Sequence, residues 1–382
     1  MEWKITNIGS LCNRVCSGGT PKSTNNAYYN GNIPWLNTKE VNFNRIYDTE
    51  KNITQLGLEN SSAKWISENS VIVAMYGATA GKVAITKIPI TTNQACCNLS
   101  INSEIADYNF VYYFLCSKFY ELSSLANGGA QQNLNAQIIK DFPIKIPVNL
   151  SDQRKIAGIL SALDAKIENN NKINANLESQ AQALFKSWFV DFTPFKDQPF
   201  VDSELGPIPQ GWKVGKLGDI CTFKRGKNLL SKNAIDEGVP VVAGGLSPSC
   251  YHNQANTSAP VVTVSGSGAN AGFMRMYHVD VWASDCSFID VSCDYLYFVY
   301  CFLSVNRRLL KHAQTGAVQP HVKTADIHDF DVVIPEEDIV KAFQSIIKEL
   351  LTKVGVNEKE NQRLAALRDT LLPKLMSGEI KL

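Results

Sequence analysis

The sequence predicts an α+β protein in which two related, mostly-β globules alternate with two long helices. Three observations predict this fold class. The chain repeats itself once, each half ends in a sustained helical pattern, and a stretch rich in proline and glycine separates the halves. With 382 residues the chain is long enough for two or three domains, and a hydrophobic fraction of 45% is typical of proteins that bury substantial cores.

The internal repeat consists of short blocks that return in the same order with small insertions between them. The matched blocks are Trp3-Lys4 with Trp212-Lys213, residues 71–73 before 77–81 with 261–264 before 268–272, 110–115 with 298–303, 129–132 with 316–319, and Asp141-Phe142 with Asp329-Phe330. One structural unit is therefore used twice.

The two globules are predicted over residues 1–150 and 212–336. Both lack long helical periodicity and contain short β-branched and aromatic runs bounded by Gly, Asn and Pro, as in residues 71–76 and 261–264. Each also contains one apolar run of helical length, residues 108–122 and 294–311. We expect mostly strand with small helices in each globule.

Residues 151–190 and 337–382 are predicted to be the long helices. From Ile156 and from Phe343, seam residues recur at alternating steps of four and three, which indicates a coiled coil. Both seams contain two asparagines, which fix the register because a buried amide needs a partner; these are Asn170, Asn174, Asn357 and Asn361. The asparagines align in a parallel or an antiparallel pair, so they do not choose the direction. Gly355 should weaken its helix by about 1 kcal/mol.

Residues 191–211 are predicted to be a linker, because four prolines and two glycines in this stretch break any helix. A helix of about 38 residues is about 57 Å long, which exceeds one turn of DNA. If both globules recognised DNA, the protein would recognise two half-sites with a fixed gap. Because the globules differ in sequence, the site would be bipartite and asymmetric.

Composition and motifs argue against catalysis and metal binding. Lys and Arg total 37 against 36 for Asp and Glu, so a polycation is excluded. None of the 10 cysteines forms a C-x-x-C pair, and the sequence contains no G-x-x-x-x-G-K-[ST], H-E-x-x-H, G-x-S-x-G or Asn/Asp-Pro-Pro-Tyr/Phe motif. The glycine-rich residues 264–272 are interpreted as a tight turn after a strand. Without a signal peptide or a long apolar run, we expect a cytoplasmic protein with no membrane contact.

Four motifs carry a resemblance to a known family. They are Trp3-Lys4 to Gly9 with residues 17–21, the linker sequence of residues 205–212, residues 146–164 at the start of the first long helix, and residues 371–380. In their order, spacing and duplication they resemble the specificity subunit of type I restriction-modification systems over essentially the full chain. The second copy departs from the pattern where Gln153 would recur, since Ile339 or Val340 stands at that place.

The resemblance implies two target-recognition domains on an antiparallel coiled coil with pseudo-two-fold symmetry, each recognising half of a split site in double-stranded DNA. It also implies that the helices set the gap and dock two modification subunits, which carry S-adenosylmethionine and methylate adenine N6. A restriction subunit using ATP and magnesium is compatible with it. No cofactor is expected on this chain, which would supply recognition and no chemistry.

Candidate DNA contacts are polar and basic side chains in loops, because base edges are recognised by hydrogen bonds and phosphates by cations. In the first domain they are Thr20, Lys22, Tyr76, Thr79, Lys82, Gln131, Gln132 and Asn133. In the second they are Arg225, Lys227, Ser267, Asn270, Arg275, Gln319, His321 and Lys323. The alternative is that these residues belong to ordinary solvated loops.

Candidate contacts with the modification subunits lie on the first long helix: Gln153, Arg154, Lys155, Phe185 and Phe189. For the two phenylalanines the alternative is that they close the apolar end of the helix pair. At the level of function, the alternative to a DNA-specificity subunit is a scaffold whose repeated globules bind protein or glycan. The DNA sequence and the gap length do not follow from the chain itself.

Overall fold

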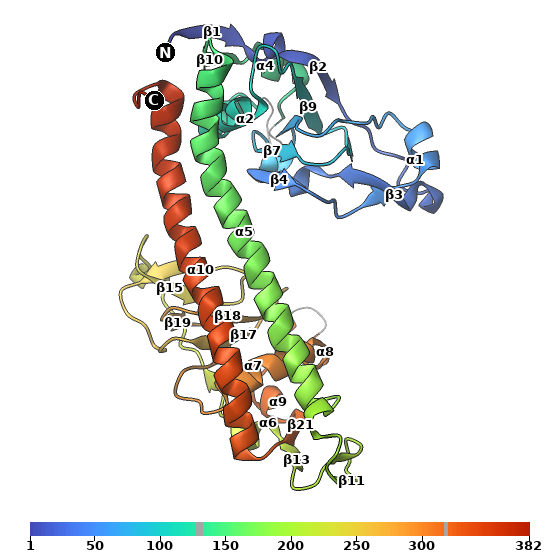
Figure 1. Ribbon diagram of the computed structural model, residues 1–382, viewed down its shortest axis with the longest axis vertical. Helices are drawn as coiled ribbons and strands as arrows, with labels where there is room; N and C mark the ends of the chain where they lie inside the picture. Colours follow the sequence, from blue (N-terminus) through green and yellow to red (C-terminus); the bar gives the residue numbers. More distant parts are fainter. Residues whose placement is uncertain (127–132, 317–319) are drawn as a thin grey trace. The chain divides into compact units, whose positions relative to one another are not determined.

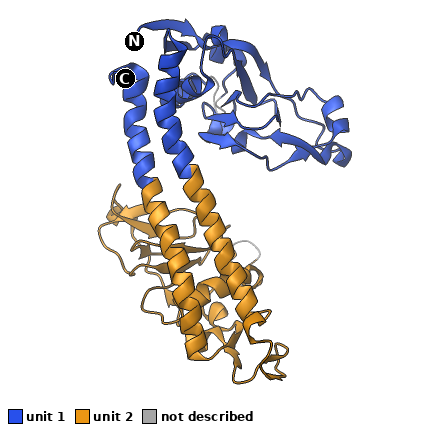
Figure 2. Ribbon diagram, in the orientation of Figure 1, with its two compact units in different colours: residues 1–167, 362–382 blue, residues 168–361 orange. Residues whose placement is uncertain are grey.

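The computed structural model describes residues 1–126, 133–316 and 320–382. These residues form two compact units, unit 1 with residues 1–167 and 362–382 and unit 2 with residues 168–361 (Figure 2). Each unit combines one globule with segments of both long helices. The globules contain mixed sheets and short helices, which confirms the predicted fold class.

Unit 1 is built on a five-stranded sheet whose buried side packs against an apolar helix (Figure 1). The sheet order is β2 (Cys12–Ser17), β9 (Cys96–Ile101), β6 (Val71–Ala74), β7 (Val83–Thr86), β4 (Asn44–Ile46). A second sheet has the order β5 (Asn52–Ile53), β3 (Tyr29–Leu36), β8 (Thr91–Thr92), and β1 (Trp3–Asn7) pairs with β10 (Pro143–Pro147). The helices of the globule are α1 (Gln55–Glu59), α2 (Tyr108–Ser117), α3 (Phe119–Ser124) and α4 (Ala136–Asp141).

Unit 2 repeats this architecture, but its main sheet has one strand fewer among the described residues. Its main sheet has the order β14 (Lys224–Arg225), β20 (Cys286–Ile289), β17 (Val261–Ser265), β18 (Met274–Tyr277). A second sheet has the order β16 (Cys250–His252), β15 (Val239–Val242), β19 (Trp282–Ala283), and β13 (Lys213–Lys216) pairs with β21 (Asp331–Ile334). The short helices are α6 (Leu217–Ile220), α7 (Leu296–Val305), α8 (Arg307–His312) and α9 (Thr324–His328).

Each apolar helix is divided in two, although the sequence predicts one continuous helix in each globule. The break lies at Lys118 between α2 and α3, and at Asn306 between α7 and α8. At these residues ψ is 15° and 37°, outside the helical range. The buried faces of α2 and α7 contain some of the largest fully buried side chains, among them Phe110, Tyr113 and Phe298.

The two long helices are α5 (Leu150–Phe189) and α10 (Glu337–Ser377), close to their predicted ranges. Their paired segments run antiparallel within each unit. In unit 1 Arg368 Nη1 donates to Asp164 Oδ1 at 2.8 Å. In unit 2 Asn170 Nδ2 donates to Asn361 Oδ1 at 2.9 Å, and Asn357 Nδ2 donates to Asn174 Oδ1 at 2.8 Å. Helix α10 ends before Gly378, whose φ of +81° suits a helix C-terminus.

The predicted linker contains a short helical turn at Thr193–Phe195 and a two-stranded sheet of β11 (Phe200–Val201) and β12 (Ile208–Pro209). Aromatic rings pack the linker against the hydrophobic core of unit 2. The rings of Phe192 and Phe195 lie 5.6 and 5.0 Å from the ring of Trp212. These contacts order a segment that prolines alone would leave extended.

Candidate nucleic-acid interface

In unit 1, backbone hydrogen bonds bring four loops together at one end of the main sheet. Met75 N donates to Ala95 O at 2.8 Å, and Leu134 N donates to Met75 O at 2.7 Å. Gly19 N donates to Thr92 O at 2.9 Å. The loops that follow β2, β6 and β8 and precede α4 therefore form one surface, which contains most of the predicted DNA contacts of the first domain.

Unit 2 builds the same surface with the same connections. Gly266 N donates to Asp285 O at 3.0 Å, Val322 N donates to Gly266 O at 3.1 Å, and Lys227 N donates to Ala283 O at 2.9 Å. Isolated bridges join Tyr76 to Asn133 in unit 1 and Ser267 to His321 in unit 2. Tyr76 and Ser267 are thus matched positions, as are Asn133 and His321.

Glycines shape the matched loops after β6 and β17. Gly81 and Gly272 have φ values of +86° and +77°, a backbone conformation that residues other than glycine rarely adopt. A Cβ atom on Gly81 would lie 3.1 Å from Ser123 N, and one on Gly272 would lie 3.0 Å from Leu310 O. The glycines therefore allow each loop to turn back closely against α3 or α8.

A tryptophan supports the surface in each unit, and sequence reasoning did not find this pair. Trp35 Nε1 donates to Gly19 O at 2.9 Å, and Trp282 Nε1 donates to Lys227 O at 2.8 Å. The carbonyls of Gly19 and Lys227 occupy matched positions, but the tryptophans do not. Trp35 lies on β3, the middle strand of its sheet, whereas Trp282 lies on β19, an outer strand of the corresponding sheet in unit 2. No alignment of the repeat would have matched them, because they do not occupy equivalent sequence positions.

The predicted contacts of the first domain have different environments. Tyr76 is 42% exposed, Lys22 and Asn133 are exposed, and Thr20 donates to Gln94. Thr79 Oγ1 donates to Tyr76 O at 3.3 Å, and Lys82 Nζ donates to Asn42 Oδ1 at 2.8 Å. Gln131 and Gln132 lie outside the described residues.

In the second domain a carboxylate that the sequence did not single out organises the predicted contacts. Asp285 accepts hydrogen bonds from Arg225 and from Ser267. It directly precedes Cys286, and the matched residue before Cys96 in unit 1 is the apolar Ala95, so the repeat did not mark this carboxylate. A carboxylate at this position can accept a hydrogen bond from cytosine N4.

The other predicted contacts of the second domain divide into two groups. Lys227, His321 and Lys323 are exposed, and Asn270 Nδ2 donates to Gly244 O at 3.2 Å. Gln319 lies outside the described residues. Arg275 lies on β18 and not in a loop, and it forms an ion pair of 3.6 Å with Glu358 of α10.

The chemistry that these surfaces offer is hydrogen bonding and charge. Burial raises the pKa of the Cys97 and Cys286 thiols to about 12, so both strands next to the loops carry neutral thiols at neutral pH. Within the described ranges, no group of three His, Cys, Asp or Glu side chains could hold a metal ion. Such surfaces can bind a ligand by its polar edges and phosphates.

Three of the predicted contacts with modification subunits are wrong, because the side chains are buried. Phe185 and Phe189 are 2% and 5% exposed and pack against Phe343 in the core of unit 2. Gln153 is 0% exposed. Arg154 and Lys155 are exposed on α5.

Gln153 instead ties a long helix to its globule. Its Oε1 accepts a hydrogen bond from Asp107 N at 2.8 Å, and its Nε2 donates to Pro147 O at 2.8 Å. In unit 2 Gln344 has the same task, since its Oε1 accepts from Tyr297 N at 3.0 Å and its Nε2 donates to Asp294 O at 2.7 Å. A glutamine thus plays the same part in the second copy, although it lies four residues beyond Val340 in the sequence.

With this geometry established, comparison with known proteins identifies the family. The family model described as type I restriction modification DNA specificity domain matches residues 1–179 and again residues 209–368. The chain belongs to the type I restriction-modification specificity family. The double match coincides with the repeat seen in the sequence and with the repeated architecture of the two units.

Relatives in this family cover the whole chain. The MjaIX specificity subunit of Methanocaldococcus jannaschii is 30% identical, over 100% of this chain and 94% of its own length. The HindI specificity subunit of Haemophilus influenzae is 22% identical, over 99% and 100%. The crystal structure of the M. genitalium S subunit has the same fold, with a TM-score of 0.62, 20% identity and coverage of 98% of this chain and 96% of that chain. No helix in the described part of the chain is long and apolar enough to cross a membrane.

Proposed function

We propose that this specificity-family chain recognises a bipartite, asymmetric DNA site, with one half recognised by each unit. The observation that carries the proposal is that one four-loop surface is built twice on the same backbone connections but with different side chains. Tyr76 and Asn133 in unit 1 are replaced by Ser267 and His321 in unit 2. Two loop surfaces with the same backbone structure but different side chains suit two half-sites of different sequence.

The candidate side chains divide by chemistry into two proposed roles. Asn133, His321 and Asp285 carry groups that pair with base edges. Lys22, Lys227 and Lys323 carry charges that suit phosphates, which position a protein on the duplex without specifying sequence. The near-neutral total charge supports a further proposal, that tight binding depends on basic surfaces of partner subunits.

The proposed partners are two modification subunits that bind S-adenosylmethionine and methylate adenine N6, with a restriction subunit that uses ATP and magnesium as an additional member. Family membership and the absence of catalytic motifs in the sequence support a role in recognition without chemistry. Arg154 and Lys155, exposed on α5, remain proposed contacts with a modification subunit. We further propose that the lengths of α5 and α10 set the gap between the half-sites.

The decisive experiment is single-molecule mapping of DNA methylation in cells that express the chain with its modification subunit, compared with cells that lack only this chain. We expect an N6-methyladenine motif of two defined parts around a fixed gap, which disappears without the chain. The absence of any chain-dependent motif, with an active and bound modification subunit, would support the scaffold alternative and overturn the proposal.

A further inference from the structure

The main sheets of the two units end differently. In unit 1, β4 runs parallel to β7 and completes the sheet, with Asn44 opposite Ala84 and Ile46 opposite Thr86. The counterpart of β7 in unit 2 is β18, since β7 and β18 pair in the same register with β6 and β17. Among the described residues of unit 2, no strand pairs with the outer edge of β18. Unit 2 therefore lacks the strand that covers this edge in unit 1.

The outer edge of β18 has backbone N–H and C=O groups in the positions where β7 of unit 1 pairs with β4. Ser265 N donates to Phe273 O at 2.9 Å, and the register places Thr263 opposite Arg275. Because hydrogen-bonded pairs alternate along an antiparallel ladder, the N–H and C=O of Met274 and Met276 point away from β17. In unit 1, Val83 O, the counterpart of Met274 O, accepts a hydrogen bond of 2.8 Å from Phe43 N. An unpaired edge of this kind is a template for another strand.

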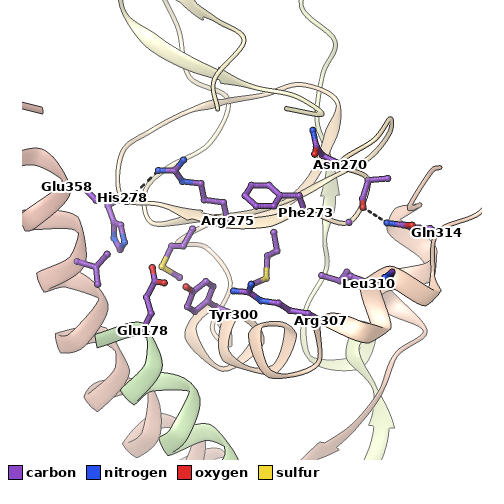
Figure 3. A pocket seen from close by; sticks show the side chains of 16 residues that line it. Glu178, Asn270, Phe273, Arg275, His278, Tyr300, Arg307, Leu310, Gln314 and Glu358 are labelled. Atoms are coloured by element: carbon purple, nitrogen blue, oxygen red, sulfur yellow. Dashed lines mark hydrogen bonds and ion pairs between the residues drawn. The ribbon is translucent and has the colours of Figure 1, made fainter. Parts of the chain in front are cut away.

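A cavity of about 470 Å³ lies along this edge, within unit 2. Figure 3 shows Phe273 and Arg275 of the β18 segment on one side and Tyr300, Arg307 and Leu310 of α7 and α8 on the other. Glu178 of α5 and Glu358 of α10 close one end. The cavity thus has a hydrogen-bonding edge, apolar surface and charged side chains.

The corresponding place in unit 1 is filled by the chain itself. The ring of Phe43, directly before β4, packs edge-on against Phe119 at 5.2 Å. Arg45 on β4 donates to Ser161 Oγ of α5 at 2.7 Å. An extended segment therefore fits between the sheet edge and the helices in this architecture.

The residues that would meet such a segment differ in charge between the units. Phe119 begins α3, and Arg307 begins α8 at the matched position. Helix α8 reads Arg-Arg-Leu-Leu-Lys-His, whereas α3 reads Phe-Tyr-Glu-Leu-Ser-Ser. Arg307 forms no ion pair with a described residue. Its charge acts on Glu178 from a greater distance: burial raises the pKa of the Glu178 carboxyl group, and Arg307 partly offsets this rise. The open site therefore carries a cation at the place where Phe119 of unit 1 packs against an aromatic ring.

We propose that the outer edge of β18 accepts an extended segment of a protein partner, which adds a parallel strand to the sheet and places an acidic side chain against Arg307. Main-chain hydrogen bonds to Met274 and Met276 would supply affinity, and Arg307 would supply selectivity, as in other cases of strand addition. This proposal does not depend on DNA recognition by the loop surfaces.

The test uses the full-length chain and two fluorescent peptides based on its own residues 41–48, Val-Asn-Phe-Asn-Arg-Ile-Tyr-Asp. One peptide keeps Phe43, and the other has Glu at that place. By fluorescence anisotropy at low salt, we expect the Glu peptide to bind about tenfold more tightly, as a charge-assisted contact would give. The variant Arg307→Glu should reverse this preference. The control Arg308→Glu, on the same helix but outside the cavity lining, should leave it unchanged.

A second variant tests the edge itself. Met274→Pro removes an N–H that faces away from β17, a change that edge strands tolerate, and it should abolish binding of both peptides with little change in melting temperature. Three results would overturn the proposal. They are no binding at millimolar peptide, binding that survives Met274→Pro, and competition for the edge by a second copy or by duplex DNA, which sedimentation and a DNA titration would reveal.

Discussion

Each long helix contains one glycine in its interior, and the surroundings of the two glycines differ. Gly158 on α5 is exposed, and a Cβ added there would have no heavy atom within 4 Å beyond its own helix. Gly355 on α10 packs against His278, and a Cβ there would lie 2.6 Å from the His278 Cβ. Glycine lowers helix stability at both positions. Packing requires a glycine at Gly355, whereas nothing in the surroundings of Gly158 requires one.

This difference predicts opposite effects of the same substitution. Gly158→Ala should raise the free energy of unfolding by up to about 1 kcal/mol, because alanine is the better helix former. Gly355→Ala should lower it by about 1–3 kcal/mol through overpacking against His278. Urea denaturation of both variants checks this. Stabilisation by Gly355→Ala would contradict the observed packing.

His278 itself should make the protein sensitive to acid. Burial, with a smaller effect of Arg275, lowers its pKa to about 4 from an ordinary 6.5. The neutral ring is therefore favoured in the folded state, so its contribution is complete above pH 6.5 and is lost as the pH falls towards 4. The loss should be up to about 3 kcal/mol.

The pKa of a neighbouring carboxyl group is also shifted, so this prediction concerns a difference between two chains. Glu358 lies beside His278, and burial raises its pKa, which acts in the opposite direction because a carboxyl group that protonates easily when folded gains stability in acid. We expect unfolding free energies of the native chain and of His278→Gln to converge between pH 6.5 and 4. Parallel curves would show that His278 titrates alike in both states.

At the scale of elements, each pair of helical segments is tied by polar contacts at its seam. Asn174 and Asn357 are 8% and 1% exposed and satisfy each other through one hydrogen bond of 2.8 Å. Asp164 accepts from Arg368 and also from Tyr113 Oη at 2.6 Å, which links both helices to α2 in unit 1. These contacts have specific partners, so they distinguish one register from the next.

The asparagine pair predicts strong coupling between two substitutions. Asn174→Leu alone should cost about 1–3 kcal/mol, because it leaves the buried amide of Asn357 without its acceptor. Adding Asn357→Leu should recover most of the loss, since two leucines satisfy each other by apolar contact. A double-mutant cycle measured by denaturant unfolding tests this, and simple additivity of the two effects would contradict a shared hydrogen bond.

At the scale of the whole molecule, the two units present equivalent loop surfaces with independent side chains. Asn133 and His321 occupy the matched bridge positions. In the described part of the chain each unit has its own hydrophobic core, and each loop surface belongs to one unit. Recognition by the two units should therefore be separable.

This separation predicts half-specific loss of recognition. Asn133→Ala should weaken discrimination by about 1–3 kcal/mol in one half of the DNA site, and His321→Ala in the other half only. Methylation of a library of randomised sites by the assembled complex measures both. Gln137→Ala is a suitable control, because this exposed side chain bonds only to Asp141 in the described structure. Loss in both halves from one substitution would contradict separate readers.

Local pattern by itself determined much of this protein. The repeat, the family, the paired globules and the ranges of α5 and α10 follow from it, since helical period and block order are recorded in neighbouring residues. It also indicated the loops that Tyr76, Asn133, Ser267 and His321 join, because matched loops recur in matched places.

Only the tertiary structure decided which side chains remain free. It buried Gln153, Phe185 and Phe189, directed Arg275 to Glu358, and revealed Asp285 behind Arg225. It also left β18 without the strand that covers β7. The physical reason is that burial and pairing depend on residues distant in the chain, such as Asp107 for Gln153, and a local period does not contain them.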